Sequence, residues 1–290
     1  MPWFKRLLYL IAIGLIALLG LSLSGVYLYR GTPGWYRPRV ASTQQVRDAA
    51  NRADQKMLDL FSWAASAQAQ QRRQQLGKSI PGEVPIGPKT VSFDEDEINS
   101  FIATWKGAET SDIEQRISRY FTGGRIVFED DGVILAGQSP EFGTLVSAEF
   151  SPSIDDQGKL HLDLSSLNAG RLPIPRSAVA GKMQRLQFLL EQQLSVNQPN
   201  VRIDESLTAN GPAIAASWIR HLMAALDEQP TDPILIVPFD MTDLGRGLPV
   251  KVTAIKVVEG SVSLTLEPVS LGERGQLVNN LRQSSVQFSE

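Results

Sequence analysis

The longest apolar stretch of the chain lies at its N-terminus, where Leu7–Tyr29 is a run of 23 residues without a charge. A helix rises about 1.5 Å per residue, so this run is long enough for the roughly 30 Å hydrocarbon core of a bilayer. Aromatic residues lie where the end of such a helix would meet the lipid headgroups: Tyr27, Tyr29, Trp35 and Tyr36. The pattern predicts a transmembrane helix over 7–29 that stays as an anchor.

A cleaved signal peptide is the competing interpretation of this run. A signal peptide has an apolar region of about 7–15 residues and ends at a small-residue cleavage site, whereas this run is longer and has no Ala-x-Ala pattern. The charges leave the orientation open, because basic residues lie on both sides of the run. By analogy with other short-tailed anchors, we expect a cytoplasmic tail over 1–6 and the bulk of the chain outside the cytoplasmic membrane.

A second pattern, with apolar residues three and four positions apart, predicts a helix from Ser42 to about Leu76. Its stripe consists of Val46, Ala50, Ala53, Met57, Leu60, Ala64 and Ala67. A linker over 30–40 precedes the helix, and glycines and prolines in Gly77–Pro88 end it, so we expect a stalk helix and a Gly/Pro linker over 41–90. Two interpretations stay open. The stripe packs on its own domain, or it mediates self-association of 42–76.

The patterns after Val91 alternate between short helices and strands. Acidic residues at 94–97 favour a helix start, and an apolar face follows at Ile98, Phe101, Ile102 and Trp105. Strands then dominate in two hairpins with acidic turns, 125–128 with 133–136 and 144–150 with 160–167. Two amphipathic helices are expected next, one opening near Ser177 and one over 213–226.

The chain then returns to strands. An edge strand is expected at 234–237 before Pro238, and a closing hairpin at 250–258 and 261–268 around Glu259-Gly260. The polar residues 271–290 are expected to form a C-terminal tail, either loose or as a terminal helix. Together, these helices and strands predict an α+β extracytoplasmic domain over 91–270, in which a curved antiparallel sheet packs with long amphipathic helices.

The composition excludes several kinds of chemistry. Cysteine is absent, which removes disulfides, thiolate metal sites and a cysteine nucleophile. His161 and His221 are far apart in the sequence and fit no ligand motif, so no metal or cofactor is expected. A net charge of −3 disfavours a nucleic-acid surface. No nucleophile elbow or phosphate loop is present, and the paired acids at 94–97, 130–131 and 155–156 fit helix and turn starts. We therefore expect no catalytic residues.

The apolar helix faces allow another kind of site. Amphipathic helices on a sheet can enclose a concave apolar groove for an acyl chain, although the same side chains can simply fill a core. The expected groove lining is Ile98, Phe101, Ile102, Trp105, Val179, Met183, Leu186, Leu190, Trp218 and Leu222.

Several short segments carry a resemblance to known families. The segment Val91–Ile102, the turn Asn168–Pro175 and the closing pair Leu248–Ile255 with Glu259-Gly260 resemble those of YpmS-like bacterial proteins. The closing pair also resembles that of LmeA-like lipid-binding envelope proteins. The resemblance implies a single N-terminal anchor, an extracytoplasmic α+β domain and, in some relatives, lipid binding. It implies no catalytic residues.

These observations favour a non-enzymatic protein of the bacterial cytoplasmic membrane with most of its chain extracytoplasmic. The leading hypothesis is that it binds a lipid or another hydrophobic component of the envelope. The alternative is an envelope scaffold or assembly factor that acts through its stalk helix. A hydrolase comes third, since no residue pattern supports it.

Overall fold

The structure is a computed structural model that describes residues 28–29, 31–36, 41–104, 122–140, 143–175, 217, 221, 224–225, 227–238, 247–270, 272–274 and 277. Most of the predicted anchor, 7–27, lies outside these residues, as does most of the predicted tail, 271–290. Within the described part of the chain, no helix has the length and apolar character needed to cross a membrane.

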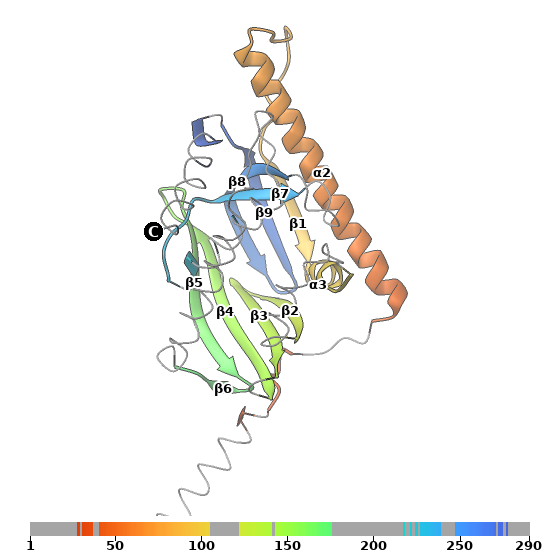
Figure 1. Ribbon diagram of the computed structural model, residues 1–290, viewed down its shortest axis with the longest axis vertical. Helices are drawn as coiled ribbons and strands as arrows, with labels where there is room; N and C mark the ends of the chain where they lie inside the picture. The colour runs from red at the N-terminus through yellow and green to blue at the C-terminus, as the bar shows by residue number, and fades with distance from the viewer. Residues whose placement is uncertain are drawn as a thin grey trace, which may run out of the picture.

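The described chain combines helices with two antiparallel sheets, which confirms the α+β class (Figure 1). The four-stranded sheet has the order β1-β9-β8-β7, with bounds Lys89–Asp94, Ser261–Pro268, Gly247–Val258 and Ile234–Pro238. The five-stranded sheet has the order β2-β3-β4-β5-β6, with bounds Thr122–Glu129, Gly132–Ser139, Thr144–Ile154, Leu160–Ala169 and Leu172–Pro173.

The prediction of one curved sheet is wrong, because the first strand pairs with the last. β1 was not expected as a strand, yet its residues align with β9 from Lys89↔Leu266 to Asp94↔Ser261. This pairing makes one sheet of the first strand and the last three, and the strands in between, β2 to β6, form the other sheet. The two sheets meet through their turns, where the Gly260 N–H donates to the Phe128 carbonyl at 3.0 Å.

The predicted hairpins are confirmed. β2 and β3 join around Asp130-Asp131, where Asp131 has φ +60°. β4 and β5 join through a turn in which the Asp155 carboxylate accepts the N–H groups of Gln157 and Lys159. The closing hairpin β8–β9 turns at Gly260 with φ +79°, and β7 is an edge strand as expected.

The segments after β5 agree only in part with the prediction, and some of them lie outside the described residues. The turn after β5 carries an unexpected short strand, β6, that pairs back on Asn168 and Ala169. The helix expected to open near Ser177 lies outside the described residues. The helix expected over 213–226 is confirmed at its described positions, which are helical at Ser217, His221, Ala224 and Ala225.

The long predicted helix is confirmed as α2, Thr43–Gln75. Its N-terminus is a capping box, in which the Ser42 hydroxyl accepts the Gln45 N–H at 3.2 Å and the Ser42 N–H donates to the Gln45 side chain at 2.9 Å. The helix runs diagonally across the four-stranded sheet (Figure 1).

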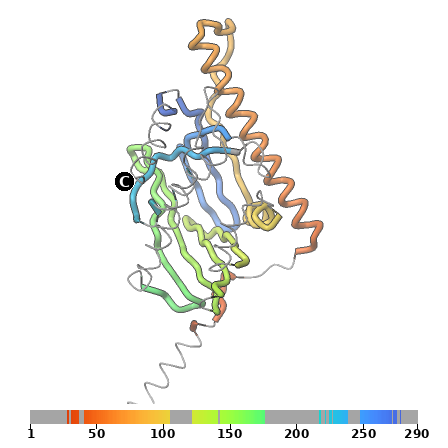
Figure 2. The backbone as a smooth tube through the Cα atoms, viewed as in Figure 1, coloured from red at the N-terminus to blue at the C-terminus, as the bar shows by residue number. Residues whose placement is uncertain are grey.

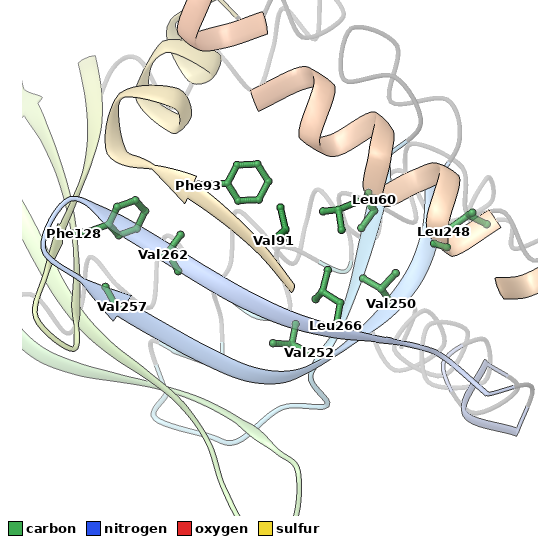
Figure 3. Close-up of a cluster of buried hydrophobic side chains, with 12 residues drawn as sticks. Leu60, Val91, Phe93, Phe128, Leu248, Val250, Val252, Val257, Val262 and Leu266 are labelled. Atoms are coloured by element: carbon green, nitrogen blue, oxygen red, sulfur yellow. The ribbon is translucent and has the colours of Figure 1, made fainter. Parts of the chain in front are cut away.

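The apolar stripe of α2 packs into the chain's own core. Leu60 and Ala64 are 2% and 4% exposed and belong to one cluster with residues of β1, β8 and β9 (Figure 3): Val91, Phe93, Val250, Val252, Val262 and Leu266. Ala50, Ala53 and Ala67 are also buried, and Val46 and Met57 are partly buried. The helix therefore shares a core with the strands and does not stand apart from them as a stalk. This agrees with the first interpretation of the stripe, in which it packs on its own domain.

The Gly/Pro segment after α2 runs back along the helix. The buried Gln70 amide donates to the Val84 carbonyl at 2.8 Å and accepts the Ile86 N–H at 2.9 Å. The Trp63 indole donates to the Gly87 carbonyl at 3.2 Å. These bonds fix the segment against the last turns of α2 and bring the chain to β1.

Candidate functional site

The acidic residues at 94–97 begin helix α3, Glu95–Thr104, and one of them is buried. Glu97 is 1% exposed and lies 2.6 Å from the Lys56 ammonium and 3.3 Å from Arg52 Nε, both on α2. Burial raises the pKa of Glu97, but the hydrogen bonds from Lys56 and from the Asp94 N–H outweigh burial and lower it. Glu97 therefore joins α3 to α2, a structural role in line with the sequence interpretation.

A second set of polar contacts joins α3 to β2. Glu95 pairs with Arg125 at 2.7 Å, and both side chains are largely buried. The Asn99 amide donates to the Ile126 carbonyl at 2.6 Å and accepts the Ile126 N–H at 2.8 Å. The acidic start of α3 thus fastens three elements together and leaves no free carboxylate pair for acid–base chemistry at Glu95 and Glu97.

Both histidines bind neighbouring groups of the fold. His161 lies 2.9 Å from the Asp155 carboxylate in the β4–β5 turn. His221 is 9% exposed, with its ring nitrogens 2.9 Å from the Thr231 hydroxyl and 3.0 Å from the Ile234 carbonyl. Among the residues that the structure describes, no group of three or more His, Asp or Glu side chains is arranged to hold a metal ion.

The structure describes three of the ten residues expected to line a groove. Ile98 packs on the main core, Phe101 is half-buried and Ile102 is 39% exposed, and the groove lined by them stays a prediction. The other seven lie outside the described residues: Trp105, Val179, Met183, Leu186, Leu190, Trp218 and Leu222.

The strand register reveals an apolar face that the sequence analysis did not single out. Residues directly opposite each other in antiparallel strands lie on the same face of the sheet. Two apolar rows cross β2 to β5 in this way: Phe128, Val133, Phe150 and Leu164 form the first, and Ile126, Leu135, Ala148 and Leu167 form the second. From here on, the name apolar row is used for the second set alone, Ile126, Leu135, Ala148 and Leu167.

The two rows differ in burial. Phe128, Phe150 and Leu164 are at most 7% exposed, and Ala225 of the following helix packs on Phe150 and Leu164. In the apolar row, by contrast, Leu135 is 37% exposed and the other three side chains are half-buried. The apolar face is thus closed over the first row and partly open over the next.

The opposite face of the same strands is mixed, because Val127, Ile134 and Ala136 are buried on it beside polar groups. Glu149 accepts a hydrogen bond from Ser166 at 2.9 Å, and the Asn168 amide donates to the Ser166 hydroxyl at 3.1 Å. Burial raises the pKa of Glu129, and so do the carboxylates of Glu149, Glu259 and Asp130. The five-stranded sheet therefore has one apolar side and one side on which buried apolar residues lie beside acidic groups, and the apolar side suits a hydrocarbon ligand better.

Residues 28–29, at the end of the predicted anchor, and residues 31–36 after it are fixed to the end of this sheet, at the foot of the molecule (Figure 2). The Thr144 hydroxyl donates to the Tyr29 carbonyl at 2.7 Å. The Arg171 N–H donates to the Leu28 carbonyl at 2.7 Å, and its guanidinium donates to the Thr32 carbonyl at 2.8 Å. Gly170 allows this approach, because a Cβ there would lie 2.1 Å from the Tyr29 carbonyl oxygen.

The apolar row lies close to this docked segment. Ala148 and Thr144 are both in β4, four residues apart, which corresponds to about 13 Å along a strand. One further row, Gly137, Val146 and Ala169, separates them and is buried. A ligand on the apolar row would therefore lie about 13 Å along β4 from Thr144, which binds the end of the predicted anchor.

The sequence contained only a weak signal for the apolar row. Val133-Ile134-Leu135-Ala136 is a continuous apolar run, because Ile134 and Ala136 are also buried, on the other face. Without alternation, periodicity does not tell which residues share a face. The pairing of β3 with β4 supplies that information.

Comparison with known proteins gives no relative on which to rest a function. No protein-family model, no curated protein and no solved structure matches the chain. The resemblance to YpmS-like and LmeA-like proteins accordingly stays a prediction from short segments.

Proposed function

We propose that this protein is a membrane-anchored, extracytoplasmic protein that binds a lipid or another hydrophobic component of the envelope on the apolar row. The proposal includes the anchor over 7–29 and a non-enzymatic role. The site is formed by Ile126, Leu135, Ala148 and Leu167.

The observation that carries the proposal is the docking of 28–36 on the end of the five-stranded sheet. Leu28 and Tyr29 are the last residues of the apolar run, and their carbonyls are bonded to Arg171 and Thr144. A bilayer-spanning helix that ends there would hold the partly open apolar face next to the membrane surface. Trp35 and Tyr36, whose rings meet edge to face at 5.9 Å, suit the headgroup region.

The chemistry of the row fits a hydrocarbon chain. Its four side chains carry no polar atom, so binding is driven by removal of apolar surface from water, at about 25 cal/mol per Å². No reaction is required of the site, and the described carboxylates on the other face are not directed to it.

The test is lipid retention by the full chain. Protein purified in detergent is stripped of lipid, exposed to phosphatidylglycerol and analysed by native mass spectrometry. We expect bound lipid, and about tenfold weaker retention in Leu135→Gln, since a polar amide placed on the row costs about 1–2 kcal/mol of binding.

Val258→Gln is the matched control, because Val258 is 38% exposed on the four-stranded sheet, as Leu135 is 37% exposed on the other. Absence of any bound lipid, or equal retention by the two variants, would contradict the proposal.

This fold disfavours the alternative of a scaffold that acts through the stalk helix. The stripe of α2 is already buried against the chain's own core, so a second copy would have to displace the sheet to use it. A monomeric mass for the full chain in detergent, by light scattering at high concentration, would remove self-association from consideration.

A further inference from the structure

The most exposed large apolar side chains of the described residues gather at one end of the molecule. Val84 is 79% exposed, Leu76 62% and Ile80 57%, and the next in order, Leu58, is 42% exposed. All three belong to residues 76–88, where the chain leaves α2 and turns back. We call this segment the tip. Three such side chains lie within nine residues, and a concentration of exposed apolar side chains is typical of an interaction site.

The tip is held in a defined conformation. The Gln70 side chain is 4% exposed and bonds Val84 and Ile86 through their backbones. Arg73 pairs with Glu83 across the turn. Gly77 and Gly82 have φ of +65° and +82°, and Pro81, Pro85 and Pro88 restrict the rest. The exposed side chains are thus presented by a fixed loop, which lowers the entropy lost when they are buried.

The charge around the tip is positive. Residues 72–88 contain three bases, Arg72, Arg73 and Lys78, and one carboxylate, Glu83, which pairs with Arg73, so two positive charges are in excess. Basic residues beside exposed aliphatic ones complement an anionic lipid surface, where each Lys or Arg contributes about 1 kcal/mol and the aliphatic side chains enter the headgroup boundary.

The tip and the docked segment lie at opposite ends of the molecule. α2 has 33 residues and is therefore about 50 Å long. Figure 1 shows the helix rising away from the body to the tip at the top, whereas 28–36 lies at the bottom beside β6. A chain anchored at its foot would point the tip away from its own membrane.

We propose that the tip inserts into an anionic bilayer that faces the membrane carrying the anchor, so that the protein contacts two lipid surfaces. This inference rests on the anchor of the proposed function but not on lipid binding at the apolar row, and it uses different residues. Val84, Ile80 and Leu76 enter the facing bilayer, and Lys78 and Arg72 bind its headgroups.

A single labelled cysteine tests the proposal, since the chain has none of its own. The full chain carrying Val84→Cys is labelled with an environment-sensitive dye and reconstituted into phosphatidylcholine nanodiscs. We expect a blue shift of the dye when vesicles of phosphatidylcholine with phosphatidylglycerol are added, and none with phosphatidylcholine alone. Ser62→Cys, on an exposed position of the middle of α2, is the control and should show no shift.

Two results of the dye experiment would overturn the proposal. A blue shift in the nanodiscs before vesicles are added would show that the tip lies on its own membrane. No shift on addition of anionic vesicles would show that the tip does not enter lipid at all. Either result would leave the proposed site on the apolar row standing, because retention of lipid there is measured without vesicles.

Capture of the nanodiscs by anionic vesicles provides a second, independent readout. In co-sedimentation, Ile80→Ser should weaken capture about tenfold and Lys78→Gln about fivefold, whereas Leu58→Ser should not change it. Leu58 is the next most exposed aliphatic side chain and lies on α2, away from the tip. Equal capture by Ile80→Ser and Leu58→Ser would contradict the proposal.

Discussion

The buried carboxylate of Glu97 is the clearest case of a residue whose role depends on its partners. Its oxygens are bonded by Lys56, Arg52 and the Asp94 N–H, which explains why burial does not keep it protonated. The acids at 94–97 were expected at a helix start from the sequence. The burial of one of them could not be predicted, because the bases that pair with it lie on α2, 41 and 45 positions away.

Glu97→Gln should lower the free energy of unfolding by about 1–3 kcal/mol, because the amide keeps the shape of the side chain but loses its charge-assisted bonds. The measurement is urea unfolding of the full chain in detergent, followed by tryptophan fluorescence. Asp54→Asn, an exposed carboxylate on α2, is the control and should change stability by less than about 0.5 kcal/mol. Equal stability of the two variants would show that the pairing contributes nothing.

Glu273 gives the fold a defined dependence on pH. Burial raises the pKa of this carboxyl, but hydrogen bonds from Ser270 and Lys251 outweigh burial and lower it from 4.5 to about 2. A pKa that is lower in the folded chain adds stability above pH 4.5, and this stability is lost as the pH falls from 4.5 towards 2. Unfolding midpoints measured across that range should fall less steeply for Glu273→Gln than for the native chain. An unchanged slope would contradict this assignment.

Gly170 and Gly158 form a matched pair for testing the docked segment. Both have positive φ, +62° and +70°, so alanine costs about 1 kcal/mol at either position. Only at Gly170 would the new Cβ meet another part of the chain, the Tyr29 carbonyl. Gly170→Ala should therefore speed amide hydrogen exchange at 31–36 and at the Arg171 N–H, and Gly158→Ala should not. Equal exchange in both variants would mean that the docking is not tight.

At the scale of elements, the role of α2 depends on the strands of the four-stranded sheet that it packs against. Leu60→Ala should cost about 2–5 kcal/mol of unfolding free energy, because Leu60 is 2% exposed among residues of the four-stranded sheet. Leu58→Ala, at 42% exposure on the same helix, is the control and should cost less than about 0.5 kcal/mol. If Leu60→Ala left the unfolding midpoint unchanged, α2 would not belong to the cooperative core.

Local patterns predicted most of the described elements. The ends of α2 follow from the Ser42 capping box and from Gly77, and the bounds of β9 and the three hairpin turns follow from acidic and glycine residues. β1 was missed although Val91 and Phe93 alternate with polar residues, because Ser92 and Asp94 were interpreted as caps of the following helix, and β6 was missed because it has only two residues. Both are defined by the strands that they pair with.

At the scale of the whole molecule, the pairing of strands that are far apart in the sequence determines the features that local patterns did not predict. The alignment of Asp94 with Ser261 makes two sheets instead of one, and the register of β2 to β5 brings Ile126, Leu135, Ala148 and Leu167 onto one face. The site expected on helix faces depends mainly on residues outside the described ones. The apolar face that is described comes from strands, and the docking of 28–36 gives that face its place beside the predicted anchor.

The central claim is that lipid binds the apolar row beside the anchored membrane, and photo-crosslinking tests it most directly. The full chain is reconstituted with phosphatidylglycerol that carries a diazirine in its acyl chain, irradiated, digested and mapped by mass spectrometry. We predict adducts on β3 to β5 around Leu135 and Leu167, and none around Val258, which is equally exposed on the four-stranded sheet. Adducts absent from β3 to β5, or equally frequent at Val258, would contradict the account.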